Sequence, residues 1–440
     1  MPLKRIPTPT QDAGNWGTIL NDHIAQTQNP LNGAFNSFDQ FSARPTNLAA
    51  DDAGRTYLYT QTGNWHEWSG SEWIVRDTND IANIKDYGAI GNTNPTTMVG
   101  NDDTNAIKLA IIKAKRSEQK LSIYIPNGDF KVSDSLEVTG LNVFGLNNKG
   151  WIRATQGEFD IFVTTFETTF SGFNIHGGWK NDTPNLKGNA IYASNPVFGN
   201  VRFNNMIIIF AKENGIKIFR CGYANISSCT IRACGDNCIY LLGLDTGPNG
   251  TTTVTINNST SVSDTPYGYG VKIENCYNIT LDTVICETSK GFLISEGFRT
   301  INFLNCYQEN IRGEKFLTWG NNANGYNINL IGNFSSKQSI DYNPRVKGLN
   351  AFGNTMGDIN ASGDVTGGVA FGASYGFNQR SEDGGTDTTM EFNRISTLQS
   401  GHAKPPLSLG TYKMWIDATG KLRIKNGVPT SDLDGNIVGL

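Results

Sequence analysis

Charge is sparse in this sequence, and positive charge is nowhere concentrated. Asp, Glu, Lys and Arg make up 17% of the 440 residues, and the formal net charge is −4. Because nucleic-acid binding needs a concentrated basic patch, we expect no nucleic-acid partner. No apolar run reaches the roughly 18 residues of a membrane-crossing helix, so we expect no membrane insertion. The first residues, Met1-Pro-Leu-Lys-Arg-Ile, precede polar residues rather than an apolar segment. We therefore expect synthesis in the cytoplasm without a signal peptide.

Cysteine and histidine are scarce as well. The seven cysteines lie between residues 221 and 306 without a repeated CxxC spacing, and the chain has four histidines. A zinc site around Cys229, Cys234 and Cys238 stays open as an alternative, but no histidine is near them in the sequence. We expect reduced, buried cysteines, no metal and no cofactor.

Glycine and the β-branched and turn-forming residues are abundant instead. The chain has 49 glycines and is dense in Asn, Thr, Ser, Ile and Val, which is typical of a β-rich protein with many turns. Short strands begin at residues 215, 238, 270, 291 and 315, so their spacing is 21 to 32 residues. This is the length of one coil of a parallel β-helix. One coil cannot bury its own apolar face, so the coils must stack.

Three sequence blocks precede these repeats. Asp86-Tyr-Gly-Ala-Ile-Gly91 is followed by Asp102-Asp-Thr-Asn-Ala-Ile107 and by Tyr124-Ile-Pro-Asn-Gly-Asp-Phe-Lys-Val132. The second block begins a predicted helix, because apolar residues recur from Ile107 at helical spacing up to Ala114. The three blocks, in this order, resemble the first segment of pectate-lyase-like β-helix proteins. The resemblance implies an all-β fold, a right-handed single-stranded parallel β-helix over residues 80–335 with an N-terminal capping helix.

Small modules are predicted on both sides of the β-helix. In residues 1–79, two aromatic strands surround a Ser69-Gly70-Ser71 turn, and three tryptophans form either a miniature core or a sugar-stacking platform (Trp65, Trp68 and Trp73). In residues 336–440, the pattern at 410–427 predicts a β-hairpin that turns at 418–420. An isolated hairpin is only marginally stable in water, so we expect it to pack on a neighbouring subunit.

This order of modules resembles phage tailspikes and tail fibres, and the equivalent spike of a phage-derived contractile injection system. The resemblance implies a homotrimer that binds cell-surface polysaccharide. It implies that residues 1–79 anchor the spike to a tail or baseplate protein, and that residues 336–440 serve trimerisation or receptor binding. The implied location is a virion tail or an extracellular phage-tail-like particle.

Acidic residues recur once per coil after one series of strands. Aligned coils predict one line of carboxylates, spaced by about 4.8 Å, the distance between neighbouring strands (Glu213, Asp236, Asp264, Glu287 and Glu309). Carboxyl groups about 5 Å apart suit a retaining glycosidase, and those about 6.5–9.5 Å apart suit an inverting one. Glu287 and Glu309 are the leading catalytic pair, with Asp236 as the third candidate. The alternative is a solvated row of acids at the solenoid corners.

Three functions remain open from the sequence. The first is a polysaccharide depolymerase, a glycoside hydrolase or a lyase, that uses the carboxylate pair. The second is a non-catalytic spike in which Tyr307, Trp319 and Tyr326 stack on sugars. A secreted pectinase is disfavoured by the missing signal peptide and by the additional modules. We favour the binding spike.

Overall fold

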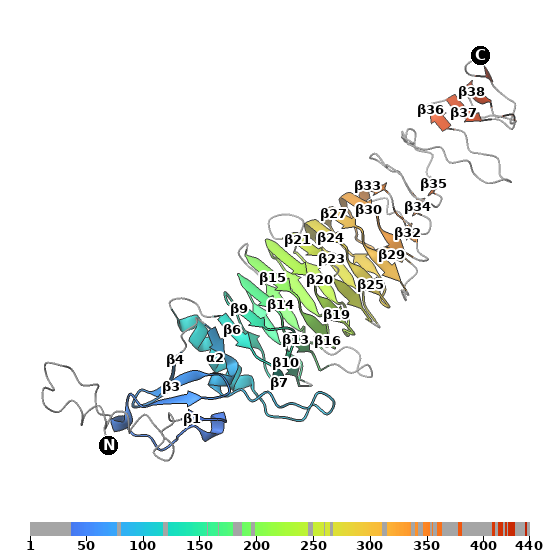
Figure 1. Ribbon diagram of the computed structural model, residues 1–440. Coiled ribbons are helices and arrows are strands. Elements are labelled where there is room, and N and C mark those ends of the chain that lie inside the picture. Colours follow the sequence, from blue (N-terminus) through green and yellow to red (C-terminus); the bar gives the residue numbers. More distant parts are fainter. Residues whose placement is uncertain are drawn as a thin grey trace.

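The regular structure of the described residues is mostly β-strand. The computed structural model describes residues 37–76, 81–117, 122–178, 187–194, 199–244, 250–309 and 315–335, with gaps at 156, 166, 259 and 265–266, and shorter stretches between 339 and 437. Residues 1–36 of the predicted N-terminal module and much of 336–440 lie outside the described residues. Within the described part of the chain, three long parallel sheets account for most of the structure (Figure 1).

Each coil of the chain adds one strand to each of the three parallel sheets in turn. Sheet 1 contains β5 (Ile81–Asn83), β6 (Ser122–Ile125), β9 (Asn142–Gly145), β12 (Thr168–Ser171), β15 (Asn200–Asn204), β18 (Tyr223–Ser227), β21 (Thr251–Asn257), β24 (Cys276–Asp282), β27 (Phe298–Leu304), β30 (Gly325–Ile331) and β33 (Val346–Phe352). Sheet 2 contains β7 (Gly128–Val132), β10 (Gly150–Ala154), β13 (Asn174–His176), β16 (Ile207–Ile209), β19 (Thr230–Arg232), β22 (Ser261–Ser263), β25 (Ile285–Glu287), β28 (Tyr307–Glu309) and β31 (Phe334–Ser335). Sheet 3 contains β8 (Leu136–Glu137), β11 (Phe162–Thr164), β14 (Ile191–Ser194), β17 (Ile216–Phe219), β20 (Ile239–Leu242), β23 (Val271–Glu274), β26 (Phe292–Ile294), β29 (Lys315–Trp319), β32 (Ser339–Asp341), β34 (Ile359–Ser362) and β35 (Phe377–Arg380).

This arrangement confirms the predicted all-β fold with a parallel β-helix. Strands β32, β33, β34 and β35 continue the ladders of sheets 1 and 3 beyond residue 335. Within the described part of the chain, no helix is both long and apolar enough to cross a lipid bilayer.

The core is a stack of inward-facing apolar side chains. Alternate residues of many described strands are buried, and like residues lie above one another, as in the parallel rings of Phe170 and Phe203, 5.5 Å apart. All seven cysteines are buried in this core without a disulfide, as the sequence predicted. Burial raises the pKa of the Cys229 thiol to about 11 and that of Cys276 to about 12, so these thiols stay protonated and unreactive.

The corner between sheets 1 and 2 is made by a residue in the left-handed conformation. Seven consecutive coils have one such residue, with φ between 50° and 67° (Gly172, Asn205, Ser228, Asn258, Thr283, Asn305 and Gly332). Glycine and asparagine tolerate this conformation better than other residues do. This backbone requirement explains why the strands of the sequence end in Asn, Gly or Ser.

The predicted capping helix is α2 (Thr104–Arg116). Its predicted apolar face, which begins at Ile107, is buried against β5, β6 and β8 at the N-terminal end of the β-helix (Figure 1). The Asp102 carboxylate accepts a hydrogen bond from the Thr104 backbone N–H at 3.0 Å at the start of the helix. Asp103 instead holds the preceding loop, because its carboxylate accepts from the backbone N–H groups of Ile90 (2.7 Å) and Gly91 (3.2 Å).

A small sheet precedes the β-helix. It contains β1 (Ser37–Phe38), β2 (Thr56–Tyr59), β3 (Asn64–Trp68) and β4 (Trp73–Arg76), and the pairing of β3 with β4 confirms the predicted aromatic hairpin. Trp68 and Trp73 pack against each other, with ring centroids 5.6 Å apart, on one face of the sheet. Because side chains alternate along a strand, Trp65 lies on the opposite face. The three tryptophans therefore do not form one platform, and the miniature-core interpretation fits the pair.

A buried carboxylate joins this small sheet to the β-helix. Asp86, in the first predicted sequence block, is 1% exposed. It accepts hydrogen bonds from the Thr62 hydroxyl and from the Asn64 side-chain amide at 2.6 Å. The His66 ring nitrogen Nε2 lies 3.5 Å from the same carboxylate. All three neighbours of Asp86 come from residues 62–66 of the small sheet.

A second small sheet lies near the C-terminus. It contains β36 (Leu407–Leu409), β37 (Tyr412–Ile416), β38 (Leu422–Asn426) and β39 (Asn436–Ile437). Strands β37 and β38 are antiparallel and pair from Tyr412 with Asn426 to Ile416 with Leu422, which confirms the predicted hairpin.

Candidate functional site

The two leading catalytic candidates are direct neighbours. Glu287 is the last residue of β25 and Glu309 the last residue of β28, and the two are partners in the parallel register of sheet 2. Their backbones are therefore about 4.8 Å apart, the spacing of adjacent strands. Both side chains are half-buried on the outer face of the β-helix.

Aromatic residues flank this pair of carboxylates. The Tyr307 hydroxyl donates a hydrogen bond to the Glu309 carboxylate, and this bond, more than any other influence, raises the pKa of the phenol. The Tyr307 ring stacks on the ring of Phe334 in the next coil, with centroids 5.2 Å apart and planes 8° apart. Carboxylates beside exposed aromatic surface are suited to sugars, which present hydroxyl groups on their edges and C–H groups on their faces.

The third candidate, Asp236, is not next to this pair. It lies in the turn between β19 and β20, where its backbone N–H donates to the Glu213 carbonyl of the previous coil at 2.8 Å. The Asp236 side chain reaches the surface, but the packed atoms around its base desolvate it. This desolvation raises the pKa of its carboxyl; Lys272 opposes the rise, Glu213 adds to it and Lys290 opposes it. A raised pKa is the direction of shift that a general acid needs.

The predicted single line of five carboxylates is wrong. Glu213 and Asp236 stack on each other in the turns before sheet 3, whereas Glu287 and Glu309 end strands of sheet 2. Asp264 lies at a corner with positive φ (59°), and its backbone N–H donates to the Glu287 carbonyl at 3.1 Å. The five residues therefore occupy three different positions of the coil.

Unequal coil lengths are the physical reason for this error. The turns from sheet 2 to sheet 3 span 233–238, 264–270 and 288–291 in three successive coils. The sheet 2 strands begin at residues 207, 230, 261 and 285. Glu213 and Asp236 therefore lie four residues beyond their strands, whereas Asp264 directly follows its strand and Glu287 ends its own. Even spacing along the sequence therefore does not place residues at the same position in successive coils.

The predicted sugar-stacking aromatics lie on three different sheets. Tyr307 is on sheet 2, and Tyr326 is on sheet 1 with 52% of its surface exposed. Trp319, on sheet 3, stacks on the ring of Phe298 with centroids 6.1 Å apart. Only Tyr307 is therefore near the Glu287 and Glu309 carboxylates.

Sequence reasoning missed a set of outward side chains on sheet 3. Tyr192, Lys217, Tyr240 and Lys272 are register partners in four successive coils, and we call them the Tyr/Lys column. The Lys272 ammonium lies 4.4 Å from the centre of the Tyr240 ring, and the Lys217 ammonium lies 5.4 Å from it. A signal was present in the sequence, because each of these residues is the second residue of a repeated short strand.

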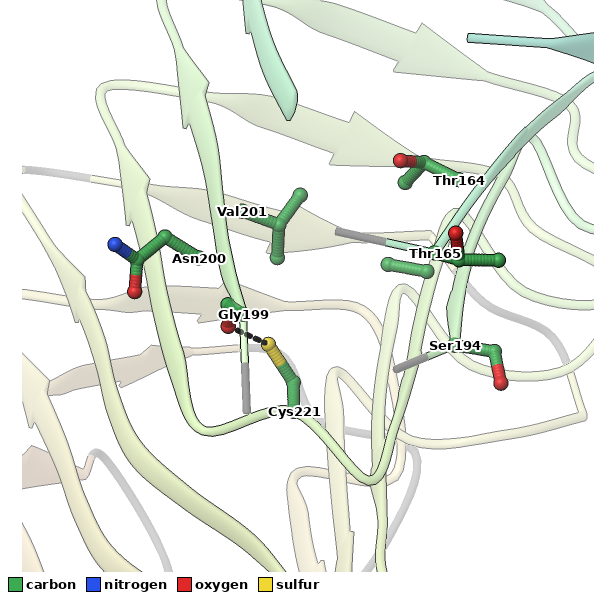
Figure 2. A pocket seen from close by; sticks show the side chains of 8 residues that line it. Thr164, Thr165, Ser194, Gly199, Asn200, Val201 and Cys221 are labelled. Carbon is green, nitrogen blue, oxygen red and sulfur yellow. Dashed lines mark hydrogen bonds between the residues drawn. The ribbon is translucent and has the colours of Figure 1, made fainter. Parts of the chain in front are cut away.

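The hollow drawn in Figure 2 is small. It lies between sheets 3 and 1, has a cavity volume of about 10 Å³, and is lined by residues that include Thr164, Ser194 and Asn200. Pockets that enclose drug-sized ligands measure roughly 300–1,000 Å³. This hollow is therefore too small to hold a sugar unit.

Comparison with known proteins gives one family match. The model of the capsule depolymerase family matches residues 387–440, which contain the C-terminal hairpin. No curated protein matches the chain. This match and the parallel β-helix together support the resemblance to a phage tailspike.

Several solved structures are similar to the chain at low sequence identity. The pre-mature gene product 12 of bacteriophage phi29 is 13% identical with a TM-score of 0.46; the match covers 67% of this chain and 53% of that one. This chain thus spans about half the length of that protein. PfbA, a surface adhesin of Streptococcus pneumoniae, is 12% identical with a TM-score of 0.47, over 78% of this chain and 99% of that one. The catalytic domain of a GH87 α-1,3-glucanase is 14% identical with a TM-score of 0.46, over 70% of both chains.

Proposed function

We propose that this chain is the subunit of a homotrimeric spike or fibre, on a phage or a phage-derived injection particle, that binds cell-surface polysaccharide. The observation that carries the proposal is the capsule depolymerase match at residues 387–440, in a chain whose β-helix has acidic and aromatic residues on its outer face. In this proposal, residues 1–79 attach to a tail or baseplate protein. Residues 80–335 bind the polysaccharide, and residues 336–440 serve trimerisation or receptor binding.

A second function, cleavage of the bound polysaccharide, is favoured by the carboxylate pair. Glu287 and Glu309 are on adjacent strands, and the backbone spacing of about 4.8 Å is close to the carboxyl separation of a retaining glycosidase. The Tyr307 hydroxyl donates a hydrogen bond to the Glu309 carboxylate and so fixes its position. In this proposal, Glu309 is the nucleophile.

Glu287 then takes the role of the acid. It would protonate the leaving glycosidic oxygen while Glu309 attacks the anomeric carbon and forms a covalent glycosyl ester. The ionised Glu287 would next remove a proton from water, which releases the sugar from Glu309 and restores both groups. A lyase would instead leave an unsaturated sugar, whose ultraviolet absorbance separates the two chemistries.

Spot tests on lawns of encapsulated bacteria test the catalytic candidate. A depolymerase leaves halos, and Glu287→Gln or Glu309→Gln should reduce polymer cleavage by at least about 100-fold, because each removes an acid or a nucleophile. Glu296→Gln, which changes a half-buried acid outside the pair, should leave the halos intact. Halos that survive both substitutions in the pair would contradict the catalytic assignment. The absence of halos with polysaccharide binding intact would favour the non-catalytic spike.

Light scattering of the purified protein tests the trimer. The expected mass is three times the 48.0 kDa of one chain. A mass near that of a single chain would contradict the spike assignment.

A further inference from the structure

The outer face of sheet 3 presents two adjacent columns of ordered side chains. The first is the Tyr/Lys column. The second contains the register partners two residues further along the same four strands, all of them half-buried (Ser194, Phe219, Leu242 and Glu274). Polar tips in the first column thus lie beside the apolar side chains of Phe219 and Leu242 in the second.

The polar groups of this face hold one another in place. The Tyr240 hydroxyl donates to the Glu274 carboxylate at 2.8 Å, and the Ser295 hydroxyl donates to the same oxygen at 3.0 Å. The Lys272 ammonium lies 3.1 Å from Glu274 and above the ring of Tyr240. Groups fixed before a ligand arrives lose less conformational entropy on binding.

Positive and negative charges are balanced on and beside this face. Three cations and three carboxylates are within the network or next to it (Lys217, Lys272 and Lys290; Glu213, Asp236 and Glu274). Lys217 lies 3.8 Å from Glu213, and both Lys272 and Lys290 act on Asp236. The three carboxylates would repel a polyanion, and the three ammonium groups would repel a polycation.

The combination fits an uncharged sugar chain. Sugar hydroxyls both donate and accept hydrogen bonds, so ammonium and carboxylate groups can each pair with them. The C–H faces of the same sugars can pack on Phe219 and Leu242. A protein partner fits less well, because charged residues are depleted at the centres of protein interfaces.

We propose that the outer face of sheet 3, from β14 to β23, is a binding surface for an uncharged, hydroxyl-rich polysaccharide that runs along the axis of the β-helix. This inference rests on the proposed function and names its ligand class. Four strands cover roughly 15 Å along the axis, room for a few sugar units. This surface is distinct from the Glu287 and Glu309 pair on sheet 2, so it holds the polymer without cleaving it.

The test compares paired substitutions on two sheets. Phe219→Thr with Leu242→Thr removes the apolar surface of sheet 3 and keeps the β-branched preference of strands. The matched control, Tyr223→Thr with Tyr277→Thr, changes two half-buried outward residues of sheet 1. Far-ultraviolet circular dichroism checks that each variant is folded.

Binding is measured on an array of purified capsular polysaccharides that includes uncharged and uronate-containing polymers. The unmodified protein should bind an uncharged polymer, and its Kd should change less than about twofold between about 0.05 M and 0.5 M salt, since no net charge is neutralised. The sheet 3 variant should bind that polymer at least about tenfold more weakly, and the sheet 1 variant as well as the unmodified protein.

The outcomes separate this inference from the proposed function. If no polymer is bound, both fail. If a polymer is bound equally well by the sheet 3 variant, or if only uronate polymers are bound, the sheet 3 inference is wrong and the spike assignment stands. A loss of trimer mass in the sheet 3 variant would identify this face as a subunit contact and would also overturn the inference.

Discussion

Replacing Asn214 by alanine should destabilise the protein more than its small size suggests. Asn214 is fully buried in a ladder of side-chain amides. Its amide nitrogen donates to the Asn189 side-chain oxygen at 2.8 Å, and its own oxygen accepts from the Asn237 side-chain amide at 2.9 Å. The ladder continues to Asp160 at one end and to the Tyr269 backbone N–H at the other.

The magnitude follows from the groups left without partners. Asn214→Ala leaves the Asn189 oxygen and the Asn237 amide buried and unpaired, and Asn189 and Asn237 are only 5% and 1% exposed. Each unpaired group costs about 1–3 kcal/mol, so we expect a loss of about 2–6 kcal/mol. Because Asn237 follows Asp236 directly, the variant should also disturb the turn that carries this candidate acid.

A second ladder provides the matched control. Asn302 has the same kind of partners on the outer face of sheet 1: it donates to the Thr280 hydroxyl at 3.1 Å and accepts from the Asn329 amide at 2.7 Å. Water can replace these bonds, so Asn302→Ala should cost less than about 1 kcal/mol. Urea unfolding followed by circular dichroism measures both variants. Equal losses in the two, or a loss below about 1 kcal/mol for Asn214→Ala, would refute the reasoning.

Three further substitutions test the corners and the response to acid. Thr283 and Asn305 are exposed and have φ of 56° and 51°. Thr283→Asn should stabilise the protein by about 0.5–1 kcal/mol and Asn305→Val should destabilise it by about 1–2 kcal/mol, because β-branched residues disfavour this conformation. Thermal unfolding in which Thr283→Asn destabilises the protein, or Asn305→Val stabilises it, would contradict the corner assignment. Burial, followed by the charge of Arg153, lowers the pKa of His176 to about 4, so its contribution to stability is complete above about pH 6.5 and is lost as the pH falls toward 4. Between about pH 7 and pH 4, the His176→Asn variant should lose about 2 kcal/mol less of its unfolding free energy than the unmodified protein does. This figure is discounted for solvent screening because the ring is half-buried. Urea titrations that give both proteins the same pH profile would contradict the prediction.

Sequence reasoning reached the fold because the fold is repetitive. The buried side of each short strand repeats in every coil, and the corner position selects Asn or Gly in many of them, as at Asn205 and Gly332. The face of α2 follows from helical spacing at Ile107. These are local preferences, and every coil repeats them.

The candidate site was predicted less well because it depends on differences between coils. Glu287 and Glu309 were expected to be neighbours and they are, since both end strands that pair in register. Asp236 was expected in the same line of carboxylates and is not, because the coil lengths vary. The partners of Tyr240 lie on strands of the neighbouring coils, so no single stretch of sequence shows the network.

The Asp86 carboxylate has a practical consequence for how the chain can be divided. Sequence character changes near residue 80, yet the groups that hydrogen-bond to this carboxylate or lie next to it come from residues 62–66. A fragment that starts at residue 80 would keep this carboxylate but lose the hydrogen bonds from Thr62 and Asn64. Mechanically, the same contacts tie the small sheet to the first coil, so a pull on one would be transmitted to the other. A stable fragment should therefore begin before residue 62 rather than at residue 80, where the sequence pattern changes.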